Sequence, residues 1–120
     1  MGGRGARSEN KRLPNYRNAE IPKNKIGNYL LNPNNKNNQE KDKLFNSIGY
    51  NMQNKAKLKE DILKQLKTSK AKLQKSNGEN KYYEVEMKLG VNKKIDFITI
   101  WLVDKKTTRF ITAKPKERKK

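Results

Sequence analysis

Cysteine and histidine are both absent from this sequence, and their absence excludes several kinds of site. Without cysteine there can be no disulfide and no zinc site built on thiolates. Without histidine the chain lacks the usual general acid and base near neutral pH and the commonest metal ligand, so a Ser-His-Asp triad in its standard form is also excluded. Any catalysis must therefore use Lys, Arg, Tyr, Glu, Asp, Ser or Thr.

Motifs for metals and nucleotide cofactors are missing as well. The best carboxylate grouping, Asp96 with Glu84 and Glu86, is too weak a pattern to specify a metal site. No glycine-rich phosphate loop of the Walker type occurs, and no GxGxxG follows a predicted strand. We therefore predict neither a metal nor a cofactor.

Long apolar runs and acidic residues are scarce. No apolar stretch approaches the roughly 18 to 20 residues that span a bilayer, and no signal peptide opens the chain, which predicts a soluble, cytoplasmic protein without a membrane partner. The 120 residues include 12 Asp and Glu against 30 Lys and Arg, a net charge of +18. A charge this large favours a polyanionic partner. AT-rich codon usage would explain part of the Lys and Asn content, but not the scarcity of acids.

Composition divides the chain into three parts. Residues 1–12, MGGRGARSENKR, have no apolar periodicity and predict a flexible basic linker, as expected for a module at the end of a longer polypeptide. Residues 13–115 are predicted to form a single domain, and residues 116–120, KERKK, a basic tail.

Helical periodicity predicts three helices before any strand. A short one begins near Pro22 and ends at Asn32-Pro33, a second lies in EKDKLFNSIGYN, and the longest runs from about Asn54 to Lys75. The residues predicted to face the core are Ile26, Tyr29 and Leu30 in the first, Leu44, Phe45 and Ile48 in the second, and Leu58, Ile62, Leu66 and Leu73 in the third.

From Tyr83 onward the apolar period changes to two. Strands are predicted over residues 83–89, 95–103 and 107–113, and the middle one is apolar on both faces, as a central strand would be. We predict an α+β domain in which the N-terminal helices pack on one face of a three- to four-stranded antiparallel sheet.

Alternation assigns the side chains of the last two strands to faces. We expect Ile98, Ile100 and Leu102 to pack on the helices, which makes the face with Thr99 and Trp101 the working surface. On the third strand, alternation sets Arg109 with Ile111 and Ala113, and Thr112 with Thr108, Phe110 and Lys114. The structural alternatives are plain core packing for Trp101 and an edge-strand salt bridge for Arg109.

A cationic surface with hydroxyls, Tyr and one Trp suits RNA cleavage. RNA carries its own nucleophile, the 2′-OH, so an enzyme needs only to align it, remove a proton and stabilise the charge on phosphorus. Arg can bind two phosphate oxygens, a Lys with a lowered pKa can share in proton transfer, and Glu84 or Glu86 could act as the base.

Four short motifs point to a known family. In order they are LPN, KIGNYLLNP, DKLFNSIGY and TIWLVDKKTTRFITAKP, and they cover about residues 13 to 115. Together they resemble a family of small C-terminal domains on phage head-morphogenesis proteins and bacterial polymorphic toxins. That family is similar in layout to the barnase, EndoU, colicin-type and RelE-type ribonucleases, in which helices precede a four-stranded antiparallel sheet and many members act without metal.

The resemblance implies site residues, position by position: Lys25, Lys43, Trp101, Arg109 and Thr112. As catalytic residues, Lys43 and Arg109 would stabilise the phosphate and Thr112 would hydrogen-bond it. Lys25 and Trp101 would bind the substrate, with Trp101 stacking on a base or holding the cleft. We add Thr99, which shares a strand face with Trp101, and Lys114, which stands where the family usually has Tyr and either substitutes for it or marks a degenerate copy.

Three functional hypotheses follow. The first is a metal-independent ribonuclease of toxin or phage type, which cleaves RNA (tRNA among the candidates) and is held in check by an acidic immunity or inhibitor protein. Such a protein would act in the cytoplasm, be delivered to a target cell or be carried by a phage particle. The alternative is a non-catalytic nucleic-acid-binding accessory module of a phage or mobile element. The third is an interaction domain whose basicity reflects codon bias.

Overall fold

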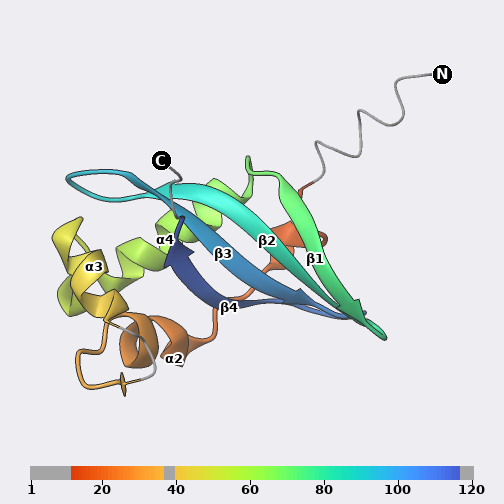
Figure 1. Ribbon diagram of the computed structural model, residues 1–120, viewed down its shortest axis with the longest axis horizontal. Helices are drawn as coiled ribbons and strands as arrows, with labels where there is room; N and C mark the ends of the chain where they lie inside the picture. The colour runs from red at the N-terminus through yellow and green to blue at the C-terminus, as the bar shows by residue number, and fades with distance from the viewer. Residues whose placement is uncertain (1–11, 37–39, 117–120) are drawn as a thin grey trace.

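The computed structural model describes residues 12–36 and 40–116, and in this part of the chain helices come first and a sheet follows (Figure 1). The helical elements are η1 (Tyr16–Asn18), α2 (Lys23–Lys25), η2 (Ile26–Leu30), α3 (Lys41–Ser47), η4 (Met52–Asn54) and α4 (Lys55–Leu66). The strands are β1 (Ala71–Asn77), β2 (Asn80–Leu89), β3 (Ile95–Val103) and β4 (Thr108–Pro115). The predicted α+β class is confirmed. Most of the predicted linker and basic tail lies outside the described residues.

The four strands form one antiparallel sheet in the order β1-β2-β3-β4. Each strand pairs with the next along the chain, so β2 and β3 are central and β1 and β4 are the edges. The prediction that residues 95–103 form a central strand is therefore correct. This simple meander brings the end of the chain, β4, to the edge beside which the first helices lie (Figure 1).

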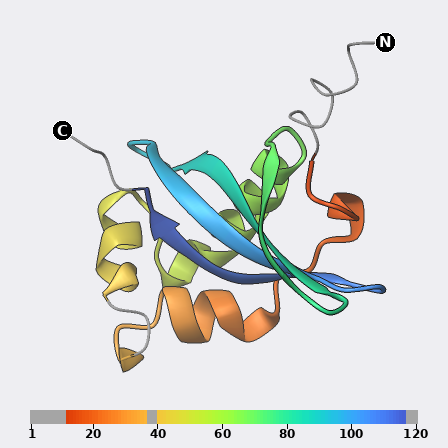
Figure 2. The same ribbon diagram turned by 45° about the vertical axis from the view of Figure 1, so that its right-hand side comes forward.

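The helices lie on one face of the sheet, and the core fills the space between them (Figure 2). Phe45 of α3 stacks on Phe97 of β3, with ring centroids 5.0 Å apart, and Trp101 meets Phe110 of β4 edge-on at 5.4 Å. The apolar stripe of α4 faces the same core through its fully buried residues, Leu58, Ile62 and Leu66. Burial of these large side chains is the main contribution to stability.

The predicted assignment of faces on β3 is wrong. Phe97, Thr99 and Trp101 are fully buried on the helix-packed side, whereas Ile98, Ile100 and Leu102 are only partly buried on the other. A buried hydroxyl is tolerated when it is hydrogen-bonded. Here Trp101 Nε1 donates to Thr99 Oγ1 at 2.8 Å, and Thr99 Oγ1 donates to the Val85 carbonyl at 2.9 Å. The face of β3 that carries the aromatic rings of Phe97 and Trp101 packs on the helices, and the face with the aliphatic side chains does not.

The predicted long helix is also wrong in its second half. Helix α4 ends at Leu66, because the hydroxyls of Thr68 and Ser69 donate to the Gln65 carbonyl at 3.3 and 2.7 Å and end the helix. The next residues form β1, in which Leu73 is half exposed instead of buried. The segment SNGEN turns β1 into β2, with Gly78 at a φ of +67°.

The N-terminal segment covers part of the outer edge of β4. Glu20 forms an isolated parallel bridge with Arg109: the Glu20 amide donates to the Thr108 carbonyl at 2.8 Å, and the Phe110 amide donates to the Glu20 carbonyl at 2.9 Å. Thr108 Oγ1 also donates to the Pro14 carbonyl at 2.7 Å. These bonds hold the following helices, α2 and η2, beside β4.

Candidate active site

Three polar side chains meet beside β4. The ammonium group of Lys41 donates to the Tyr29 hydroxyl at 3.2 Å and to the Thr112 hydroxyl at 3.1 Å. The two hydroxyls are themselves 3.2 Å apart. All three side chains are partly buried, and we call this group the Tyr29–Lys41–Thr112 triangle. An ammonium and two hydroxyls in mutual contact are a unit that can donate, accept and pass protons.

Each corner of the triangle comes from a different element. Tyr29 is on η2, a π-helical turn fixed by its buried residues Ile26 and Leu30. π-Helical turns are often found at functional sites. Lys41 is the first residue of α3, which is anchored four residues later by Phe45. Thr112 is on β4, so the triangle depends on the whole tertiary structure.

Two cations lie close to the Tyr29 ring. The ammonium groups of Lys25 and Lys41 are 5.3 and 5.4 Å from the ring centroid, within the range of cation–π attraction. Partial burial alone would raise the pKa of the Tyr29 hydroxyl. The hydrogen bonds with Thr112 and Lys41 and the charges of Lys41 and Lys25 outweigh burial and lower this pKa below its ordinary value of 10.0. The site therefore favours the phenolate more than water does.

A row of polar side chains extends from the triangle along β4. Residues directly opposite one another in an antiparallel pair share a face. Arg109, Thr112 and Lys114 lie opposite Leu102, Ile100 and Ile98, so all three are on the sheet face opposite the buried Phe97, Thr99 and Trp101. We call them the β4 row. Arg109 and Lys114 are exposed and place a positive charge on either side of Thr112.

A β-bulge makes this row possible. The β3–β4 register shifts between Ile100 and Trp101, so that Ile111 has no partner of its own. The extra residue reverses the alternation and sets Arg109 on the same face as Thr112 and Lys114. The predicted separation of Arg109 from Thr112 is therefore wrong, because simple alternation cannot detect a bulge.

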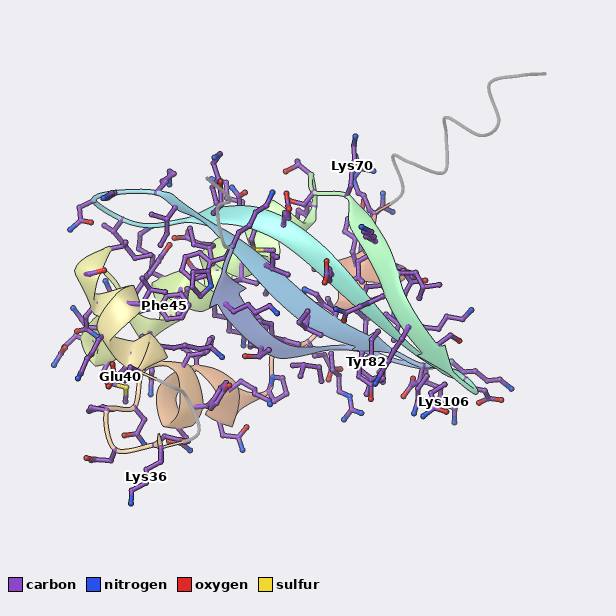
Figure 3. The ribbon with its side chains drawn as sticks, viewed as in Figure 1. Lys36, Glu40, Phe45, Lys70, Tyr82 and Lys106 are labelled. Carbon is purple, nitrogen blue, oxygen red and sulfur yellow. The ribbon has the colours of Figure 1, made fainter. Side chains whose placement is uncertain are left out.

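Lys43 and Arg109, the predicted phosphate-binding pair, are not brought together. Lys43, on α3, is exposed and forms an ion pair at 3.8 Å with Glu40, which directly precedes this helix. Arg109 lines a hollow at the β3–β4 turn together with Lys106. Glu40 and Lys106 lie at opposite ends of the molecule (Figure 3).

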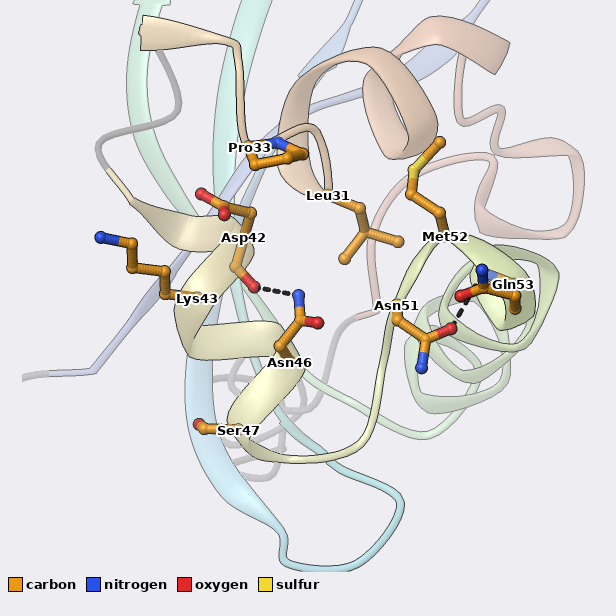
Figure 4. Close-up of a pocket in the computed structure, with 9 residues that line it drawn as sticks. All are labelled: Leu31, Pro33, Asp42, Lys43, Asn46, Ser47, Asn51, Met52 and Gln53. Atoms are coloured by element: carbon orange, nitrogen blue, oxygen red, sulfur yellow. Dashed lines mark hydrogen bonds between the residues drawn. The ribbon is translucent and has the colours of Figure 1, made fainter.

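Lys43 borders a different groove, about 690 Å³ in volume (Figure 4). The groove is lined by Leu31, Pro33, Asp42, Lys43, Asn46, Ser47, Asn51, Met52 and Gln53. Its amide groups are partly engaged: Asn46 Nδ2 donates to the Asp42 carbonyl, and Asn51 Oδ1 accepts from the Gln53 amide at 2.9 Å. None of the three residues of the triangle lines it.

Trp101 and Thr99 are sealed inside the core, so in this structure a base cannot stack on the indole ring. They are hydrogen-bonded to each other within the core. Of the predicted site residues, Lys25, Thr112, Arg109 and Lys114 belong to the triangle's surroundings or to the β4 row.

Sequence reasoning missed Tyr29 and Lys41 as functional residues. One signal was present: Lys41 precedes the buried Phe45 by four residues and so lies on the inner side of α3, whereas Lys43 does not. The hydrogen-bonding partners of Lys41 could not be found in this way, since Thr112 is 71 residues away in the sequence.

No carboxylate cluster offers a metal site in the described part of the chain. Among residues 12–36 and 40–116, no three Asp or Glu side chains are grouped so that they could hold an ion. In the same residues no helix has the length and apolar character needed to cross a membrane.

Comparison with known proteins identifies a family. A protein-family model described as a domain of unknown function (DUF6883) matches residues 12–117. No curated protein and no solved structure matches the chain. The matched range contains the whole triangle and the β4 row.

Proposed function

We propose that this chain, which belongs to the DUF6883 family, is a metal-independent ribonuclease that cleaves RNA at the Tyr29–Lys41–Thr112 triangle. The observation that carries the proposal is the direct contact of the Lys41 ammonium with both hydroxyls, beside a strand that presents positive charge on its open face. The substrate class rests on this chemistry, on the net charge of +18 and on the sequence resemblance.

The triangle supplies a base and an acid in contact with each other. The surroundings of Tyr29 lower its pKa and so favour its phenolate, and the phenolate would take the proton from the 2′-OH of the substrate. The 2′-oxygen then bonds to phosphorus. The Lys41 ammonium would give a proton to the departing 5′-oxygen as its bond to phosphorus breaks, leaving a 2′,3′-cyclic phosphate and a 5′-hydroxyl.

The hydrogen bond between Lys41 and Tyr29 would also return the two groups to their starting protonation states. After one cleavage Tyr29 holds an extra proton and Lys41 lacks one. The two groups are hydrogen-bonded at 3.2 Å, so the proton can return directly from Tyr29 to Lys41. The Thr112 hydroxyl, bonded to both, would hold them in place and contact a phosphate oxygen. This cycle needs no histidine and consumes no cofactor.

The β4 row would bind the backbone on either side of the reacting phosphate. Arg109 and Lys114 flank Thr112 on the same face: Lys114 is the alternate residue after Thr112, about 7 Å along the strand, and Arg109 lies across the bulge on the other side. Guanidinium and ammonium groups spaced in this way suit successive phosphates of an extended strand. An acidic inhibitor protein that covered the row would block the site by the same charge complementarity.

The test is cleavage of RNA in the presence of EDTA. The proposal predicts that the purified chain cuts total RNA into fragments with 2′,3′-cyclic phosphate ends, and that it leaves 2′-O-methyl RNA intact because that RNA has no free 2′-OH. Cleavage that stops in EDTA, or cleavage of the 2′-O-methyl RNA, would contradict the mechanism.

The high charge also supports a second function, that of a nucleic-acid-binding module without catalysis. This function predicts RNA binding that weakens steeply with added salt, because released counterions drive such binding. It also predicts no cleavage in the assay above.

A further inference from the structure

A second pocket lies between α4 and the hairpin that joins β2 to β3. It has a volume of about 260 Å³ and is lined by Tyr50, Asp61, Lys64, Gln65, Lys88 and Lys94. It shares no residue with the triangle or the β4 row. Its chemistry can be judged by asking which of its polar groups already have partners.

Three acceptor atoms of the residues that line this pocket are already engaged. The Tyr50 hydroxyl donates to Asp61 Oδ2 at 2.6 Å and accepts from the Gly90 amide at 3.0 Å. Asp61 Oδ2 is also 3.5 Å from the ammonium of Lys57. Gln65 Oε1 accepts from the Lys88 amide at 3.3 Å.

The donors are in surplus. Because its oxygen is engaged by the Lys88 amide, Gln65 turns the NH₂ end of its side chain away from that contact, as a donor with two hydrogens. Each ammonium group has three hydrogens, and Lys94 donates one to the Gly90 carbonyl at 3.1 Å. Lys88 contacts Asp96 at 2.7 Å. Lys64 and Lys94 thus bring two ammonium groups to the pocket beside one carboxylate, Asp61, whose charge Lys57 already shares, while the charge of Lys88 is paired with Asp96.

The backbone of the β2–β3 hairpin beside the pocket is fixed without a ligand. Gly90 has a φ of +154°, and a Cβ at this position would lie 1.8 Å from the Lys93 carbonyl oxygen, so only glycine fits. The amide of Val91 donates to the Ile48 carbonyl at 2.7 Å and ties the hairpin to the end of α3. With the bond from the Lys88 amide to Gln65 of α4, these contacts hold the backbone that carries Lys88 and Lys94 in place before any ligand arrives.

We propose that this pocket binds a phosphate group. Its donors converge from a helix and a hairpin on one space, and a tetrahedral anion with several acceptor oxygens can satisfy them together. Ammonium groups bind phosphate as point charges, so the flexible lysine stems can adjust to it. The phosphate comes either from a nucleic-acid backbone or from a free phosphate compound. The proposal goes beyond the ribonuclease activity and does not depend on it.

The experiment is a titration of the full chain with inorganic phosphate, followed by NMR of the Gln65 side-chain amide and the Gly90 backbone amide. The pocket variant is Lys64→Gln with Lys94→Gln. The matched control is Lys67→Gln with Lys93→Gln, which removes the same charge from the same two segments, at exposed positions that do not line the pocket. We expect phosphate binding to weaken about tenfold in the pocket variant, since two charge-assisted contacts are lost, and less than about twofold in the control.

Equal weakening in the two variants would overturn the proposal, because it would show binding to the overall charge alone. Phosphate titration that leaves the Gln65 and Gly90 signals unmoved would overturn it too.

A second arm identifies the source of the phosphate. A 2′-O-methyl RNA oligonucleotide resists 2′-OH attack, so its binding is measured without cleavage. If the pocket variant also loses affinity for this RNA relative to the control, the ligand is a backbone phosphate. If only inorganic phosphate is affected, the ligand is a free phosphate compound. Both results support the pocket, and neither depends on ribonuclease activity.

Discussion

The two faces of the sheet place similar residues, Thr99 and Thr112, in different surroundings. On the helix-packed face, Thr99 is fully buried and bonded to Trp101, and it serves the core. On the open face, Thr112 is partly buried and bonded to Lys41 and Tyr29, at the group where we propose that RNA is cleaved. The comparison teaches that a polar residue on a strand has a structural or a functional role according to the face it occupies. Substitutions should therefore separate stability from activity.

Replacement of the buried indole of Trp101 should give the largest change in the free energy of unfolding. Trp101→Ala removes a fully buried ring that packs on Phe110, and we expect the free energy of unfolding to fall by about 3–5 kcal/mol. Its neighbour Leu102, partly buried on the open face, is the matched position, and Leu102→Ala should cost about 1–2 kcal/mol because less apolar surface is lost. Urea unfolding of both variants measures the difference, and equal losses would remove the distinction between the faces.

Substitution of the two threonines tests more sharply whether the two faces separate stability from activity. Thr99→Val leaves the Trp101 Nε1 donor without its acceptor, and we expect it to lower the free energy of unfolding by about 1–3 kcal/mol. Thr112→Val breaks contacts in a partly exposed group and should cost less than about 1 kcal/mol, yet it should slow RNA cleavage at least tenfold. Denaturation and cleavage assays on the same two proteins check this. The opposite pattern would reverse the assigned roles of the two faces.

Two tyrosines allow a pH test of the triangle. Burial raises the pKa of Tyr50, and its hydrogen bond to Asp61 raises it further, whereas the surroundings of Tyr29 lower its pKa. NMR of the ¹³Cζ signals should show Tyr29 losing its proton below pH 10.0 and Tyr50 losing its proton above that pH. Lys41→Met should move the pKa of Tyr29 upward, because one hydrogen bond and one charge are lost. A Tyr29 signal that titrates at or above the ordinary value would contradict the proposed base.

The sign of the linked stability change follows from the same shift. Below the pKa of folded Tyr29 both the folded and unfolded chains keep the proton, so the group contributes nothing. As the pH rises through that pKa the folded chain releases the proton first, and ionisation favours folding up to the unfolded value. Relative to Tyr29→Phe, the native chain should therefore gain stability as the pH approaches 10.0, and a loss over this window would show that the pKa is raised.

The fold class could be predicted because the apolar period changes from helical to alternating along the chain. The end of α4 could not, because Lys, Leu and Gln after residue 69 suit a helix as well as a strand, and pairing with β2 decides between them. Of the site, Lys25, Arg109, Thr112 and Lys114 were expected. The triangle itself was not, since it depends on packing between segments up to 83 residues apart and on a bulge at Ile111.

The most direct test of the account compares Lys41 with Lys43 on the same helix. Lys41→Met removes the donor shared by Tyr29 and Thr112, while Lys43→Met removes an equal charge from an exposed side chain of α3 that pairs with Glu40. With RNA and EDTA, we expect Lys41→Met to lower the cleavage rate by about 10²–10³ and Lys43→Met to leave it within about twofold, with both variants folded. Equal rates for the two variants, or a loss confined to Lys43→Met, would contradict the assignment of catalysis to the Tyr29–Lys41–Thr112 triangle.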